Sequence, residues 1–105
     1  MRFFILLALL AASINASAGS VTGKVAAIDI RSSDNLHWIT MDNKGQNLPA
    51  CHTHDYWMLD EKTETGKNQL SMLIAARLSG TTVTIIGAGT CKRWGDGEDI
   101  QEVHL

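Results

Sequence analysis

The residues of this chain that are best suited to chemistry begin with a histidine pair in residues 51–55, sequence CHTHD. Because His52 and His54 alternate, they would share one face of a β-strand, where both imidazoles could bind a metal ion. A structural zinc site needs three or four ligands, so the fold would have to add His37, His104 or Asp55. Two solvated histidines on an exposed strand explain the same spacing. We therefore expect no cofactor, and a metal site based on His52 and His54 is the alternative.

A second candidate segment is the acidic, glycine-rich stretch Trp94–Asp99, sequence WGDGED. Three carboxylates beside an aromatic ring could hold calcium or the hydroxyl groups of a sugar, although the spacing does not match the EF-hand pattern. A solvated turn before the final strand is the structural alternative.

The aromatic residues are the third group that could contact a ligand. Tyr56 and Trp57 are neighbours, so on a strand they point to opposite faces, and one is expected in the core while the other could stack on a ligand. Trp38 and Trp94 are more often packing residues than binding platforms. The predicted ligand site combines aromatic and acidic side chains, namely Tyr56, Trp57, Trp94, Asp96 and Glu98.

Other classes of function have little support in the sequence. No G-x-S-x-G or P-loop motif is present, and Ser71 has no visible base beside it, so we expect a protein that is not an enzyme. The net charge is −2, and Lys92-Arg93 is the only adjacent basic pair in the region after residue 18. This balance argues against nucleic acid or an anionic membrane as partner.

The first residues indicate export. A positive start at Met1-Arg2 is followed by the apolar run Phe3–Ala12 and by the small-residue cleavage pattern Ala16-Ser17-Ala18. This arrangement is typical of a secretory signal peptide, and the run is short for a membrane span. We predict a signal peptide at 1–18, a mature domain at 19–105 and a secreted or periplasmic location.

The predicted location also bears on the state of the two cysteines of the chain. In an oxidising compartment Cys51 and Cys91 are expected to form one disulfide. The chain-entropy model gives roughly 4 kcal/mol for closing a loop of about 40 residues, which is comparable to the whole stability of a small domain.

The elements that must position these residues are predicted to be three strands, one helix and two further strands. The first strand needs a bulge near Ala26-Ala27, because its apolar residues change parity there. The expected ranges are strands at Val21–Arg31, Leu36–Met41 and Cys51–Leu59, a helix at Thr63–Ser79, and strands at Thr81–Gly87 and Ile100–Leu105. This order favours a mainly β protein with the five-stranded OB barrel, whose helix lies between strands three and four. An open α+β sandwich is the alternative.

The second half of the chain resembles a known family. Leu70–Leu78, the Ser79-Gly80 stop, Thr81–Ile86 and Cys91 follow one another as in small exported bacterial proteins related to the B subunit of subtilase cytotoxin, and Cys51 fits the partner cysteine. The resemblance implies an OB fold, a ring of five copies, a toxin A subunit as partner and binding of host glycans or glycoproteins. Toxin B subunits carry an additional N-terminal segment that supplies part of their sugar site, so no sugar-contacting residue is transferred to this chain.

These observations together predict a non-enzymatic, exported binding module resembling a toxin B subunit. A periplasmic OB-fold binding or structural protein without a toxin role is the alternative from a different class of function.

Overall fold

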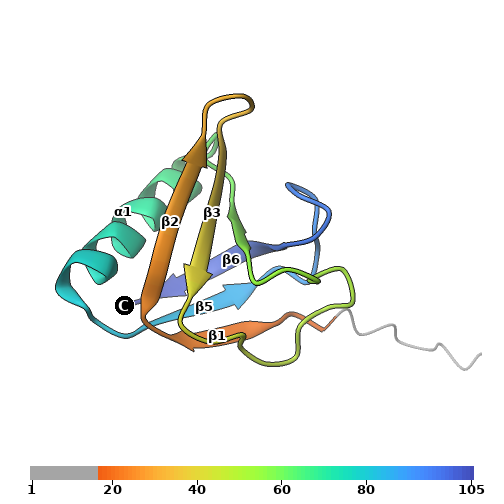
Figure 1. The fold of residues 1–105 in the computed structure, drawn as a ribbon, viewed down its shortest axis with the longest axis horizontal. Coiled ribbons are helices and arrows are strands. Elements are labelled where there is room, and N and C mark those ends of the chain that lie inside the picture. Colours follow the sequence, from red (N-terminus) through yellow and green to blue (C-terminus); the bar gives the residue numbers. More distant parts are fainter. Residues whose placement is uncertain (1–16) are drawn as a thin grey trace, which may run out of the picture.

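The computed structural model describes residues 17–105, so the predicted signal peptide lies almost wholly outside the described residues. The architecture is mainly β with one helix (Figure 1). Its elements are β1 (Ser20–Gly23), β2 (Val25–Arg31), β3 (Leu36–Met41), β4 (Trp57–Leu59), α1 (Glu64–Ser79), β5 (Val83–Gly87) and β6 (Glu98–His104). Between residues 17 and 105, no helix has the length and apolar character needed to cross a membrane.

The strands form a six-stranded open sheet in the order β1-β5-β6-β4-β3-β2. All neighbours are antiparallel except β4 and β6, which run parallel. The expected closed five-stranded barrel is therefore not what the pairing of the described strands shows. β1 and β2 lie at opposite edges of the sheet, although only Lys24 separates them in the sequence.

The predicted bulge in the first strand region is confirmed. The register of β2 against β3 shifts between Val25 and Ala27. Val25 lies in the core, and Ile28, which has the opposite parity, packs against the same core. The extra residue lets both side chains face inward, as the change of parity in the sequence required.

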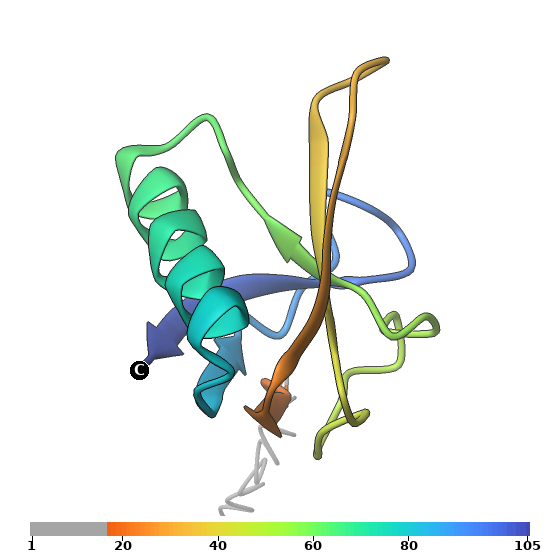
Figure 2. The ribbon, with the colours of Figure 1, turned by 60° about the vertical axis from the view of Figure 1, so that its left-hand side comes forward.

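Helix α1 agrees with the prediction to within one residue at its start. The Thr63 hydroxyl caps it by accepting the backbone N–H of Gly66 at 2.9 Å, and Gly80 ends it with a left-handed φ of 66°. Leu73 and Ala76 are buried, and α1 packs against β2, β6 and β4 (Figure 2). The helix thus covers one side of the strands and leaves the other side of β2 and β3 uncovered by it.

The third predicted strand, Cys51–Leu59, is wrong over most of its length. Only Trp57–Leu59 is a strand, because the N–H groups of Thr53 and His54 both donate to the Asp96 carbonyl oxygen, at 3.0 Å each, rather than to a neighbouring strand. His52 and His54 consequently do not share a strand face: His52 is buried and His54 is exposed. The segment before β4 is a loop held against a second loop.

The Cys51–Cys91 disulfide is present, as predicted, with an S–S distance of 2.09 Å and a Cα–Cα distance of 6.1 Å. It joins the segment before β4 to the loop between β5 and β6. These two irregular segments carry most of the candidate site residues, so the crosslink fixes their relative position.

Candidate functional site

A groove lined by aromatic residues lies on the side of the β2–β3 hairpin opposite α1. We call it the aromatic groove, and its lining residues are Arg31, Leu36, Trp38, Tyr56, Met58 and Trp94. Its cavity volume is about 180 Å³. Figures 1 and 2 show the loop between β5 and β6, which carries Trp94, on this side of β2 and β3.

The floor of the aromatic groove follows from strand alternation. Arg31 pairs with Leu36 across β2 and β3, and Trp38 pairs with Met58 across β3 and β4. Because successive side chains alternate between faces, these residues share the outer face. Ile39 and Met41, which have the opposite parity on β3, belong to the core.

Two partly exposed aromatic residues from irregular segments form the walls. Tyr56 is 36% exposed, and its ring lies 5.9 Å from that of Trp38 at an angle of 50°. Trp94 is 37% exposed, with the Arg31 guanidinium 5.1 Å from its ring centre. This is within cation–π range, so the contact holds the indole in place while part of its surface stays open.

Arg31 is itself oriented by Asp34 in the turn between β2 and β3. Its Nε and one terminal nitrogen donate to the two Asp34 oxygens at 2.9 and 2.7 Å. These hydrogen bonds are the main reason why the pKa of Asp34 falls from 3.8 to about 2. A bidentate pair of this kind contributes little stability at an exposed position, but it restricts the geometry of the guanidinium beside Trp94.

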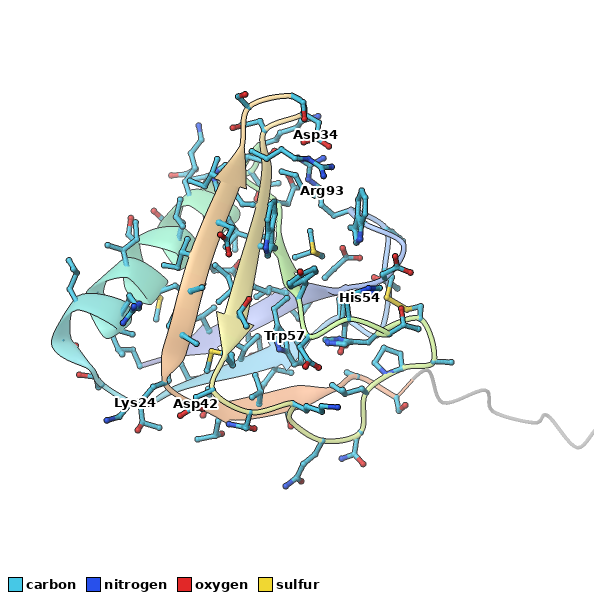
Figure 3. All side chains as sticks on the ribbon, in the orientation of Figure 1. Lys24, Asp34, Asp42, His54, Trp57 and Arg93 are labelled. Atoms are coloured by element: carbon cyan, nitrogen blue, oxygen red, sulfur yellow. A yellow bond between two sulfur atoms is a disulfide. The ribbon has the colours of Figure 1, made fainter. Side chains whose placement is uncertain are left out.

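The loop that carries Trp94 is anchored by charged groups on both sides of it. Arg93 forms an ion pair with Glu61 and also donates to the carbonyl oxygens of Asp34 and Asn35, at 3.3 and 3.4 Å. Figure 3 shows Arg93 close to Asp34 at the upper end of the hairpin.

The Asp99 carboxylate holds the same loop from the β6 side. It accepts the Thr90 hydroxyl at 2.7 Å and the N–H groups of Lys92 and Arg93 at 2.8 and 3.0 Å. Asp99, Thr90, Lys92 and Arg93 also border a more polar cavity of about 430 Å³ that shares Met58 with the aromatic groove. The two carboxylates of this cavity, Asp60 and Asp99, both already accept hydrogen bonds from the protein, so we place the candidate site in the aromatic groove.

The predicted site residues divide into three groups. Tyr56 and Trp94 line the aromatic groove. Trp57 and Glu98 are 1% and 0% exposed, so their prediction as ligand contacts is corrected: Trp57 belongs to the core, and Glu98 is enclosed beside backbone N–H groups. Asp96 ties two loops together, since its carboxylate accepts the Thr53 hydroxyl at 3.2 Å.

The two histidines of the CHTHD segment are also separated by the fold. The buried His52 packs edge-on against Trp57, with ring centres 4.9 Å apart, whereas His54 stacks on Tyr56 at 5.9 Å. Within residues 17–105, no cluster of three or more His, Cys, Asp and Glu side chains surrounds a possible cation position.

Sequence reasoning missed four groove residues, Arg31, Leu36, Trp38 and Met58. The parity of β3 could have indicated Trp38, because Ile39 and Met41 supply an inward apolar face without it. That signal was ambiguous, since Leu36 and Trp38 are equally apolar on the other face.

Comparison of the chain with protein-family models, with curated proteins and with solved structures finds no match.

Proposed function

We propose that this chain is an exported, non-enzymatic binding module of the OB type, and that its aromatic groove binds a sugar ring of a host glycan or glycoprotein. The observation that carries the proposal is the groove itself, with three aromatic side chains, a guanidinium and two apolar side chains on one face. Sugars present apolar ring faces together with hydroxyl groups, and partly exposed aromatic rings beside polar groups suit both.

The OB assignment is supported by the way the two sheet edges are connected. β1 and β2 are consecutive and separated by Lys24 alone, yet they pair with β5 and with β3 at opposite ends of the strand order. Treated as two halves of one bent strand, they make five strands, and α1 then lies between the third and the fourth. This is the connectivity expected of an OB barrel.

The size of the groove favours a small group over an extended ligand. Pockets for drug-sized ligands measure roughly 300–1,000 Å³, whereas this groove measures about 180 Å³. One ring, inserted between Tyr56 and Trp94, suits such a space. The groove's cation, Arg31, is already paired with Asp34, so the groove offers little charge to a phosphate backbone.

A role like that of a toxin B subunit is supported by the disulfide in the expected place and by the order of helix, stop, strand and cysteine. In this reading the groove recognises the receptor and an associated A subunit supplies any activity. The disulfide also favours an oxidising compartment.

A glycan array probed with the mature protein tests the proposal. The wild type should bind a subset of glycans, and Trp94→Ala and Tyr56→Ala should each reduce the signal at least ~5-fold, taking as the guide the stacking of a base on an aromatic side chain, which is worth about 1–3 kcal/mol. Leu78→Ala is the matched control, because Leu78 is 84% exposed on α1, away from the groove. Binding that survives both aromatic substitutions, or an array without signal, would contradict the proposal.

A further inference from the structure

Glu98 is a fully enclosed carboxylate with an incomplete set of partners. One oxygen, Oε2, accepts the backbone N–H groups of Gly19 at 3.0 Å and Gly89 at 2.8 Å. The other, Oε1, is buried and has no hydrogen-bond partner among residues 17–105. A buried carboxylate without a countercharge is costly, so a missing partner is expected at Oε1.

His52 does not supply the missing charge. Its Nδ1 lies 3.8 Å from Oε1, but this nitrogen accepts the backbone N–H of Glu98 at 3.3 Å, so its proton is on Nε2. Burial lowers the pKa of His52 from 6.5 against the opposing effect of the nearby Glu98 and Asp55 carboxylates, so the neutral ring is favoured. No lysine or arginine of the described chain forms an ion pair with Glu98.

The chain at residue 19 passes directly against the unpartnered oxygen. A Cβ on Gly19 would lie 2.5 Å from Oε1, and a Cβ on Gly87 would overlap the carboxylate. Gly19 is buried and its carbonyl oxygen accepts the Gly87 N–H at 2.8 Å, whereas Ser17 and Ala18 are exposed. The buried part of the chain therefore begins at the residue that follows the Ala16-Ser17-Ala18 cleavage pattern.

We propose that cleavage after Ala18 creates an α-ammonium group on Gly19 that forms a buried ion pair with Glu98, so that removal of the leader completes the mature fold. Hydrolysis by a signal peptidase adds one water across the Ala18–Gly19 bond. Ala18 leaves with a carboxylate, and the Gly19 nitrogen changes from an amide with one N–H to an ammonium with three. One N–H keeps the bond to Oε2, and a second becomes available for Oε1.

The first test compares two chains, one starting at Gly19 and one starting at Ser17, each with Glu98 or with Glu98→Gln. The Ser17 chain retains a neutral amide at Gly19, so its melting temperature should be at least ~5 °C lower than that of the mature chain. Glu98→Gln should lower the melting temperature of the mature chain more than that of the Ser17 chain, because only the mature chain is left with an unpaired buried ammonium. Equal effects of Glu98→Gln in both chains would overturn the proposal.

A second measurement does not depend on whether the variants fold. Native mature protein is treated with an amine-reactive ester, and labelling at Gly19 and at the exposed Lys24 is followed by mass spectrometry. The Gly19 amine should react at least ~100-fold more slowly in the native than in the denatured protein, as expected for a group that reacts only after opening of the fold, while Lys24 reacts equally in both. A native Gly19 amine that reacts at the denatured rate, or an exported protein whose mass places its start at another residue, would also overturn it.

Discussion

Glu61 and Glu98 are two buried carboxylates that border the same loop, and they have different kinds of partner. Glu61 pairs with the Arg93 guanidinium and has His37 Nδ1 at 3.6 Å. Among residues 17–105, the Glu98 carboxylate accepts hydrogen bonds only from the backbone N–H groups of Gly19 and Gly89. Both glutamates have polar neighbours in the sequence, so nothing in the local sequence predicts that they are buried.

The difference shows which contacts each buried carboxylate depends on, at the Glu61 end and at the Glu98 end of the loop. On the Glu61 side, a permanent side-chain cation balances the charge and also fixes the loop that presents Trp94 to the aromatic groove. On the Glu98 side, glycines bring backbone donors close to the carboxylate, and the site depends on close approach rather than on a side-chain countercharge. The two ends should therefore respond to different perturbations.

The largest effect is expected from removing the cation at the Glu61 end. Arg93→Met leaves Glu61 buried and unpaired, which should lower the free energy of unfolding by about 3–5 kcal/mol. Urea unfolding followed by circular dichroism measures the change. Adding Glu61→Gln to Arg93→Met should recover part of the loss, because the uncompensated charge is then gone. A single variant within about 1 kcal/mol of the wild type would show that the pair is not needed.

A smaller effect is expected from filling the space beside Glu98. Gly87→Ala adds a Cβ that overlaps the carboxylate, and the enclosed side chain cannot swing away. We expect a loss of about 1–3 kcal/mol, the usual range for overpacking. Gly95→Ala is the matched control, since a Cβ there meets nothing within 4 Å. Similar stabilities for the two alanine variants would contradict the tight enclosure of Glu98.

The smallest effect is a pH dependence that arises from His52, beside Glu98. Burial lowers the pKa of His52 below its ordinary value of 6.5, so protonation favours the unfolded chain. This contribution to stability is complete above about pH 6.5 and is lost as the pH falls from there towards the lower folded pKa. His52→Asn keeps an acceptor for the Glu98 N–H but does not titrate, so its melting temperature should decline less between about pH 7 and about pH 5. An unchanged slope in His52→Asn would rule His52 out as the source. The Glu61 end should add little to this slope through its cation, because Arg93 stays charged throughout.

The sequence was sufficient for the elements that depend on local chemistry. The Thr63 cap and the left-handed Gly80 mark the helix, and the strand Leu36–Met41 was placed without error. The parity change in the first strand predicted its bulge, and cysteine count with the export pattern predicted the disulfide. Each of these signals lies within a few neighbouring residues or in the composition, where propensity and periodicity act.

The tertiary structure alone decided which side chains are accessible. Tyr56 and Trp57 were equivalent in the sequence until the pairing of β4 turned Trp57 into the core and left Tyr56 beside Trp38. Long-range contacts made this choice, because a β-strand gives its two faces the same local geometry and only the neighbouring layer makes one of them inward.

Long-range contacts also give the three acidic residues of the WGDGED segment different roles. Asp96 bonds to a loop that is distant in sequence, and Glu98 is enclosed by Gly19 and Gly87. Asp99, in β6, holds the loop that precedes this strand. The sequence by itself determined a small, disulfide-linked, mainly β domain with acidic and aromatic residues near one another. Only the packing of segments far apart in the chain decided that the aromatic residues line a groove while the Glu98 carboxylate is removed from water.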